Sequence, residues 1–393
     1  MASPAAHATV PVRALGTVYL FFFGVLGALV PYWGSYLAAR GFGPEAIGVL
    51  VALLMLTKVV APPLWGTLAD LSGRPMLVLR AGALLALAAF ALVPATPAAF
   101  WPMVVVVTLY SAFWNAILPL IEATTLNHLQ GNTARYGRIR LWGSVGFILA
   151  AVSVGWALDR LPNETLPWFA LVLFTGLALS TWTLPNAPVR PAAQASPEGL
   201  WRRLARPEVL ALLWVCLLLQ GSHGPYYGFF TIYLGGLGYS KMVIGGLWAL
   251  GVLAEIGVFV LAARLLPRYR AVPLLHLTLW LTALRWVLLG GFADQWLVVM
   301  LAQLLHAASY GLYHAAAIAL VDRLFPGRLQ TRGLALYSMV GFGLGGALGG
   351  WLSGLSWAAV AGPTTFLLAG LAAALAWPGI AVLQRVRSTR ECR

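Results

Sequence analysis

Residues 242–263 read MVIGGLWALGVLAEIGVFVLAA, and this stretch decides the fold class. It is apolar over the roughly 20 residues that a helix needs to cross a lipid bilayer, yet it carries Glu255 in its middle. An ionised side chain in hydrocarbon costs about 3 kcal/mol or more, so a carboxylate at this depth usually faces a polar cavity. Four more ionisable residues lie as deep in other apolar segments: Lys58, His223, Arg285 and His306. The pattern is typical of a membrane protein with an ion or solute pathway through its interior.

The composition of the whole chain agrees with this interpretation. The 393 residues are 61% hydrophobic and 9% charged, with a mean hydropathy of +0.85. Soluble domains carry about 25% charged residues, so no part of this chain reads as a soluble domain. Apolar runs of bilayer-spanning length begin near residues 15, 46, 76, 99, 140, 167, 208, 242, 272, 296, 333 and 362. The sequence predicts an all-α integral membrane protein with 12 transmembrane helices.

The net charge of +14 follows the predicted topology. If the N-terminus lies inside, the inner loops hold most of the arginines, whereas the outer loops hold only Arg40, Arg160 and Lys241. This bias is the positive-inside rule, and it predicts that both termini are cytoplasmic. The positive charge is thus explained without nucleic acid, which we do not expect as a partner.

The two cysteines, Cys216 in a span and Cys392 in the tail, indicate neither a disulfide framework nor a metal site. The first apolar run lacks a small-residue cleavage site, so we expect a retained helix and not a signal peptide. The sequence contains no recognisable nucleophile–base set, phosphate-binding loop or appended soluble domain. We therefore expect neither an enzyme nor a sensor, and no cofactor.

The second half of the chain repeats the first. When the sequence is shifted by 197 residues, nine positions in 36–56 meet identical residues in 233–253. The predicted units are a six-helix bundle at 1–185, a polar cytoplasmic linker at 186–207 and a second six-helix bundle at 208–393. Two parallel six-helix repeats are the layout of major facilitator transporters, in which solute binds between the halves near mid-membrane.

The same register sets Lys58 opposite Glu255, so equivalent positions of the two halves carry opposite charges. Either each charge is neutralised locally and merely tolerated, or the two belong to the transport pathway. Buried ionisable groups in membranes are more often functional, so we predict that Lys58 is a buried charge partner within the pathway.

The loop after the second span reads GTLADLSGR, from Gly66 to Arg74, and resembles the signature motif of the major facilitator superfamily. Gly66 is expected to let a neighbouring helix approach closely. Asp70 is expected to accept hydrogen bonds at the N-terminus of an opposing helix, where the dipole favours an anion. Gly73 and Arg74 are expected to shape and anchor the turn. The opposing helix is predicted to be the eleventh, whose glycine-rich run at 341–350 suits close, sliding packing. We predict that this loop is a gate.

Three other spans carry polar side chains in patterns that predict a cavity lining. The Gly-Pro cluster in 220–227 weakens the helix ladder, which is tolerated beside protein or a water-filled cavity; a plain packing kink is the alternative. Positions 303, 306, 310 and 314 share one helical face, as do 111, 115 and 122. The predicted substrate-binding residues of these spans are Asn115, Glu122, Gln220, His223, Tyr226 and Tyr310.

Two arginines complete the predicted binding site. Arg140 is followed directly by apolar sequence, so it could turn inward towards Glu122 or Glu255, although an ordinary inner-face position is the alternative. Arg285 lies about 20 Å into its span at about 1.5 Å per residue, too deep to reach the near interface. It therefore needs a carboxylate, an anionic substrate or a polar lining, and an ion pair with Glu255 is the simplest prediction.

The segments 136–147, 222–230, 244–255, 284–286 and 304–316 together resemble the phenylpropionate permease family of the major facilitator superfamily. The resemblance runs from the first to the eleventh helix. It implies a bacterial inner (plasma) membrane protein, multi-pass, that acts as a proton symporter for substrates such as 3-phenylpropionate.

The wider group includes the lactose permease, and the resemblance extends to single residues. Glu122 with Arg140 resembles its substrate-gripping carboxylate–arginine pair. Its glutamate, arginine and histidine on the eighth, ninth and tenth helices are matched by three residues here: Glu255, Arg285 and His306. Ser309, however, stands where that protein has its proton-carrying glutamate. The proton-coupling residue is therefore open among three candidates, Glu255, His306 and Glu122, or coupling is absent.

The hypothesis that follows is a secondary active transporter that takes up a small organic solute, such as an aromatic monocarboxylate, with protons by alternating access. A carboxylate in a low-dielectric site can exchange protons near neutral pH, which makes Glu255 the first candidate. The alternatives are a nucleoside or sugar symporter, and an antiporter that exports drugs or metabolites. The expected partners are the solute, protons and the lipid bilayer, with the protein a monomer driven by the proton gradient.

Overall fold

The computed structural model describes residues 10–129, 133–186, 202–265 and 269–391, and the elements in these ranges are all helices. The first half contains α1 (Val12–Ala39), α2 (Pro44–Ser72), α3 (Pro75–Phe90), α4 (Phe100–Leu129), α5 (Thr133–Leu158) and α6 (Leu166–Trp182). The second half begins with α8 (Pro207–Gly221), α9 (Gly224–Gly236), α10 (Lys241–Leu265) and α11 (Ala271–Phe292). It continues with α12 (Trp296–His306), α13 (Tyr313–Leu324), α14 (Gln330–Ser338), α15 (Gly346–Ala374) and α16 (Trp377–Glu391). Proline opens α2, α3 and α8, where its fixed φ suits a first helical turn.

Several of these helices combine into single membrane spans. α8 and α9 form one span that breaks at the Gly-Pro cluster, as predicted. α12 and α13 are joined by a π-helical stretch, Ala307–Leu312, and α14 and α15 by another, Met339–Gly345. Ala361 has φ 62° and ψ −177°, which divides α15 between the eleventh and twelfth spans. With the shorter α3 included, the 12 predicted spans are confirmed.

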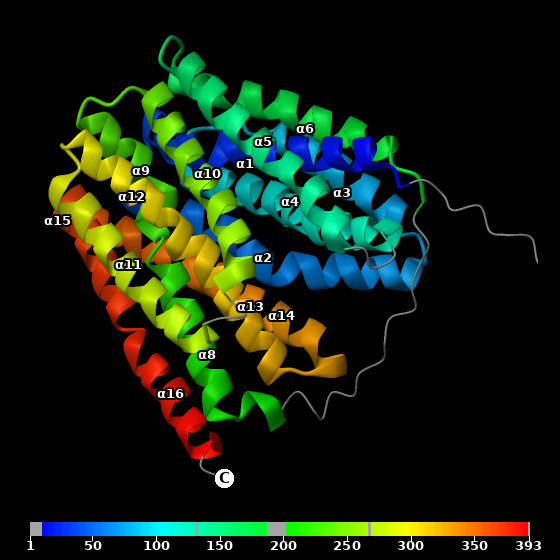
Figure 1. The fold of residues 1–393 in the computed structure, drawn as a ribbon. Helices are drawn as coiled ribbons and strands as arrows, with labels where there is room; N and C mark the ends of the chain where they lie inside the picture. Colours follow the sequence, from blue (N-terminus) through cyan, green and yellow to red (C-terminus); the bar gives the residue numbers. More distant parts are fainter. Residues whose placement is uncertain (1–9, 130–132, 187–201, 266–268, 392–393) are drawn as a thin grey trace, which may run out of the picture.

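Figure 1 shows the helices in two groups, α1–α6 and α8–α16. Most of the predicted linker at 186–207 lies outside the described residues, which resume at 202. We call the ends of the helices near the predicted cytoplasmic loops the inner ends and the opposite ends the outer ends. In Figure 1 the two groups meet at the outer ends of α9 and α10 and diverge towards the inner ends of α2 and α8.

Glycines bring the two halves together at the outer ends. Gly48 of α2 faces the backbone of α15 at Gly350 and Gly354, with no space for a side chain. Gly245 of α10 faces Ala151 of α5 in the same way. Small residues allow such close helix approach within a membrane.

These glycine contacts obey the repeat seen in the sequence. Gly48 and Gly245 are 197 residues apart, as the register predicts, and their partners lie on α15 and α5, the corresponding helices of opposite halves. A second matched pair follows the same rule: Gly354 faces Pro44, and Gly155 faces Lys241. The contacts that close the outer ends, which we call the outer closure, therefore occur twice and are related by a pseudo-twofold axis between the halves.

Hydrogen bonds reinforce one side of this closure. The Tyr32 hydroxyl donates to the carbonyl oxygens of Ala151 (2.6 Å) and Lys241 (3.1 Å), and so ties α1 to α5 and to α10. The Asp159 carboxylate accepts the N–H groups of Lys241 (2.6 Å) and Met242 (3.0 Å). An anion at the N-terminus of α10 is stabilised by unpaired N–H groups and by the helix dipole.

The predicted gating loop forms the expected turn, but it does not make the expected contacts with an opposing helix. Gly73 has φ 60° and ends α2 with its N–H bonded to the Asp70 carbonyl, while Arg74 begins the next segment. The Asp70 side chain is exposed and has no hydrogen bond to a described residue. Nothing lies within 4 Å of where a Gly66 side chain would start, so the predicted close approach at Gly66 is wrong for this structure. The run at 341–350 does face α2, but through Ala52, Met55 and Val59, farther from the inner end.

Candidate functional site

A cavity of about 160 Å³ lies between the halves and collects residues from both. Its aromatic lining is Phe23, Phe147, Tyr227, Trp248, Tyr310 and Phe342. Its polar lining is Lys58, Arg140, Ser144, Gln220, Glu255 and His306. A concave, largely apolar space with a few polar groups is the usual composition of a small-molecule site. We call this space the central cavity.

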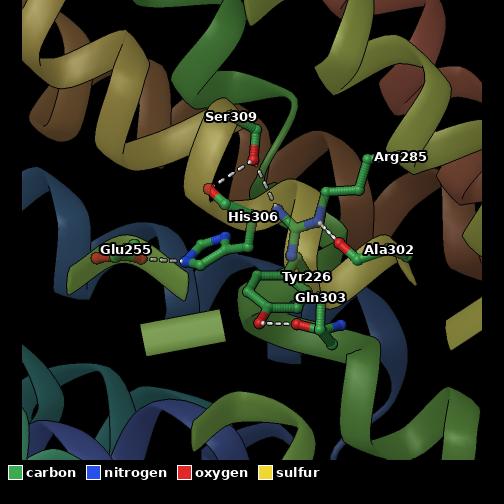
Figure 2. Close-up of polar contacts among 7 residues, drawn as sticks. All are labelled: Tyr226, Glu255, Arg285, Ala302, Gln303, His306 and Ser309. Carbon is green, nitrogen blue, oxygen red and sulfur yellow. Dashed lines mark hydrogen bonds and ion pairs between the residues drawn. The ribbon is translucent and has the colours of Figure 1, made fainter. Parts of the chain in front are cut away.

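Glu255 and His306 form a short hydrogen bond on one wall of the central cavity, and Figure 2 shows the contact. Glu255 Oε1 and His306 Nε2 are 2.6 Å apart, and the side chains are 15% and 7% exposed. Glu255 comes from α10, and His306 ends α12 just before the π-helical stretch. A buried carboxylate that shares a proton with a neighbouring imidazole and still reaches a cavity is suited to proton exchange.

Arg285 lies behind this wall and is not the partner of Glu255, so the predicted Glu255–Arg285 ion pair is wrong. Arg285 is 0% exposed. Its Nε donates to the Ala302 carbonyl (3.0 Å) and its Nη1 to the Ser309 hydroxyl (3.1 Å), as Figure 2 shows. Its guanidinium also stacks on the Tyr226 ring at 4.3 Å, a favourable cation–π contact.

Two predicted substrate-binding residues of the seventh span belong to the same buried layer. The Tyr226 hydroxyl donates to Gln303 Oε1 at 2.8 Å (Figure 2). His223 Nδ1 contacts the Leu219 carbonyl at 2.9 Å. Both side chains are buried, and neither lines the central cavity. Gln220 and Tyr227, from the same cluster, do line it. The break between α8 and α9 thus directs some side chains inward and packs others behind them.

Arg140 turns inward, as the sequence predicted. It lines the central cavity, and its guanidinium lies 3.7 Å from the centroid of the Phe23 ring. Neither Glu122 nor Glu255 is close enough to form an ion pair with it in the described structure. Glu122 instead accepts a 3.4 Å hydrogen bond from the Tyr136 hydroxyl and lies outside the cavity lining.

Lys58 lies on α2 and lines the central cavity together with Glu255. Its Nζ contacts Met55 Sδ at 3.2 Å, and a thioether is a weak acceptor. Lys58 also lines a smaller neighbouring cavity of about 30 Å³ together with Asn115. Asn115 donates to the Leu54 carbonyl and to the Thr57 hydroxyl, both at 2.9 Å, so it holds α4 against α2.

The structure therefore brings together part of the predicted site. Six predicted residues meet in the central cavity: Lys58, Arg140, Gln220, Glu255, His306 and Tyr310. Five lie elsewhere: Asn115, Glu122, His223, Tyr226 and Arg285. Among the described residues, no group of three His, Cys, Asp or Glu side chains is placed to hold a metal ion.

Sequence reasoning missed several lining residues that helical spacing could have found. Trp248 and Val252 precede Glu255 by seven and three residues, which places them on the same face of α10. Ser144 and Phe147 follow Arg140 at the corresponding spacing on α5. The helix faces that carry Glu255 and Arg140 thus predict most of the lining residues that were missed.

Comparison with known proteins places the chain among transporters. The model of the MFS_1 like family matches residues 12–368. A maltose permease of Geobacillus stearothermophilus is 34% identical over 332 residues, which cover 83% of this chain and 83% of that protein. A probable 3-phenylpropionic acid transporter of Escherichia coli (strain K12) is 29% identical and covers 84% of this chain and 87% of that protein.

The fold has a counterpart among solved structures. The crystal structure of the nucleoside transporter NupG superposes with a TM-score of 0.81 over 94% of this chain and 98% of that one, at 20% identity. At this identity the likeness establishes the shared fold alone.

Proposed function

This chain belongs to the MFS_1 like family of transporters, and from that premise we propose that it imports a small aromatic carboxylate together with protons. The carrier would work by alternating access, with the two halves rocking about the central cavity. The family and the transporter relatives also indicate a transport protein and not an enzyme.

The net charge of the residues that line the central cavity is the main support for a carboxylate as the substrate. Lys58 and Arg140 both line the cavity, whereas Glu255 is its one lining carboxylate among the described residues and is already bonded to His306. This positive excess attracts a guest with a negative charge. The planar fork of Arg140 suits a carboxylate, and the six aromatic rings suit an aromatic body.

The packed outer ends support an inward-facing state of such a carrier. The glycine contacts and the hydrogen bonds of Tyr32 and Asp159 close the outer side, and Asp70 at the inner end forms no hydrogen bond or ion pair with the other half in the described structure. A carrier in this state would release its solute into the cytoplasm.

We predict that Glu255 carries the coupled proton. Glu255→Gln keeps the size of the side chain but cannot release a proton, so uphill accumulation should be abolished while exchange of solute across the membrane continues. Both are measured with radiolabelled solute in proteoliposomes, with and without an imposed proton gradient. Full accumulation by this variant would show that Glu255 is not the coupling group.

The substrate class is tested by proton uptake. Proteoliposomes are challenged with 3-phenylpropionate and other aromatic acids, nucleosides and sugars while the external pH is recorded. Alkalinisation on adding an aromatic acid, lost in Glu255→Gln, is the expected result. A response to nucleosides or sugars alone would overturn the substrate class but keep symport. Proton release in inverted vesicles would indicate the export of drugs or metabolites.

A sugar is the second candidate substrate, because the maltose permease relative shares 34% identity over most of both chains. Aromatic rings and amide groups such as Gln220 also suit sugar rings and hydroxyls. Maltose therefore belongs in the same panel, and it differs from an aromatic acid in having no charge for Arg140 or Lys58 to bind.

A further inference from the structure

Lys58 has an unusual environment for an ammonium group. The chain contains two lysines, Lys58 and Lys241, and of these Lys58 lies inside a membrane span. Its one hydrogen-bond partner in the described structure is the sulfur of Met55. A charged group withdrawn from water is costly unless it is paired. Lys58 nevertheless points into a cavity that contains a carboxylate, so a partner is available within the same site.

The repeat places that carboxylate at the equivalent position. Lys58 and Glu255 each lie ten residues after the equivalent glycines Gly48 and Gly245, whose contacts are matched in the two halves. Ten helical residues correspond to about 15 Å along each helix. The two charges are therefore at the same depth on α2 and α10, on either side of the pseudo-twofold axis, and both line the central cavity.

We propose that Lys58 and Glu255 form an ion pair across the central cavity when the inner ends close around the empty carrier, and that the substrate's carboxylate replaces Glu255 on Lys58 in the loaded carrier. The ion pair follows from the geometry of the two halves. Its replacement by substrate rests on the proposed function.

This exchange of partners would link substrate to protons. When a substrate carboxylate binds Lys58, Glu255 loses its counter-ion and takes up one proton, so the charge of the cavity is the same in the empty and loaded carriers. In the inward-facing state the proton leaves, and Glu255 pairs with His306, as it does in this structure. The other charged or titratable groups that line the cavity are Arg140, Tyr227 and Tyr310. By reciprocity, protonation of Glu255 favours substrate binding as much as substrate favours protonation.

The ion pair is tested without any substrate. An amine-reactive reagent modifies a free amine faster than one held in an ion pair, and mass spectrometry reports Lys58 and Lys241 on separate peptides. Lys241 is the internal reference, because it lies at the outer end and donates to the Leu158 carbonyl. In Glu255→Gln, modification of Lys58 should be about threefold faster than in the wild type, a size typical of a partly exposed pair. Lys241 should be unchanged.

Equal rates at Lys58 in the two proteins would overturn the ion pair. A parallel increase at both lysines would also overturn it, because it would show a general opening of the outer end and not the loss of one partner.

The replacement by substrate is tested by the binding of 3-phenylpropionate at several pH values. The affinity of the wild type should rise as the pH falls. Glu255→Gln should bind at every pH with the high affinity that the wild type has at acidic pH. Lys58→Met should bind about tenfold more weakly, as expected for the loss of a hydrogen bond between charged groups. Lys58→Arg should restore binding, and 3-phenylpropionamide, which lacks the charge, should not distinguish Lys58→Met from the wild type.

Unchanged affinity in Lys58→Met would overturn the role of Lys58 in binding. If the wild type binds no aromatic acid at any pH, the proposed substrate class fails together with the replacement step. The lysine modification experiment still decides the ion pair in that case.

Discussion

At the scale of single residues, Arg285 and Ser309 show how a buried cation is accommodated without a carboxylate. Arg285 is enclosed on all sides, and its described hydrogen bonds go to the Ala302 carbonyl and the Ser309 hydroxyl. Two aromatic rings, Tyr226 and Trp286, cover its guanidinium. Such an arrangement fixes α11 against the tenth span and forms a support behind the Glu255–His306 pair.

Ser309→Ala should destabilise the protein, because it removes an acceptor from a buried guanidinium. The expected loss is about 1–3 kcal/mol in the free energy of unfolding. Ser353→Ala is the matched control, since Ser353 is equally buried but bonds only its own helix, at the Gly350 carbonyl. Thermal unfolding in detergent, followed by tryptophan fluorescence, compares the two. A shift for Ser309→Ala no larger than for the control would contradict this role.

The sequence predicted which charges are buried but not which of them pair. Depth along an apolar run is visible in the sequence, and it correctly placed Glu255, Arg285 and His306 inside the protein. Pairing depends on how α10, α11 and α12 are rotated about their axes. The π-helical stretch Ala307–Leu312 changes the rotation of the tenth span directly after His306, and no residue pattern predicted this stretch. The predicted Glu255–Arg285 pair failed because the Arg285 guanidinium bonds the Ala302 carbonyl and the Ser309 hydroxyl of the tenth span.

At the scale of helices, close backbone contacts determine whether the outer ends can close. Gly245 of α10 touches the Ala151 carbonyl and the Tyr32 hydroxyl, whereas nothing lies within 4 Å of where a side chain on the next residue, Gly246, would start. The two neighbouring glycines therefore offer a matched pair of substitutions.

Gly245→Leu should hold the outer ends apart and reduce transport by at least about tenfold, because each rise of about 1.4 kcal/mol in the free energy of the closed state lowers its population about tenfold. Gly246→Leu should transport like the wild type. Uptake of the identified solute checks both, together with the rate at which a membrane-impermeant reagent reaches the central cavity from outside. Equal transport by the two variants would show that the contact at Gly245 is dispensable.

The break in the seventh span was predictable from sequence, whereas the closing contacts of the gating loop were not. Glycine and proline at 221–225 weaken a helix wherever they occur, so the division between α8 and α9 followed from composition. The contacts of Asp70 and Gly66 depend on the conformational state, and here the inner ends diverge (Figure 1). A motif can identify a gate without showing whether it is open.

At the scale of the whole molecule, transport requires the two halves to exchange an outer closure for an inner one. The change can be measured between spin labels at exposed positions, in a background where Cys216 and Cys392 are replaced by alanine. The inner pair is Leu71→Cys with Arg323→Cys, and the outer pair is Ala39→Cys with Leu237→Cys.

Adding the transported solute at acidic pH should shorten the inner distance and lengthen the outer one in the same samples. Rigid rocking of two bundles about a central site predicts this opposite change. A change at one end alone would indicate a local gate and not a rocking movement.

The fold as a whole was the most predictable feature of this chain. In hydrocarbon a backbone must bond within its own helix, so apolar runs alone located the 12 spans, and the internal repeat related the two halves. The hydrogen bonds at one side of the outer closure, such as those of Asp159, could not be predicted, since Asp159 lies in an exposed position at the end of α5 with no pattern around it.

The equivalence of Lys58 and Glu255 has a consequence for the architecture of such carriers. A homodimer of identical six-helix subunits must place the same residue at both equivalent positions, so two like charges would face each other across its axis. When the halves are joined in one chain, each of the two positions can be substituted independently. The matched glycines preserve the helix packing that both halves share. Covalent fusion thus permits an opposite-charge pair on the axis of a nearly symmetric protein, which no exact dimer of this unit could contain.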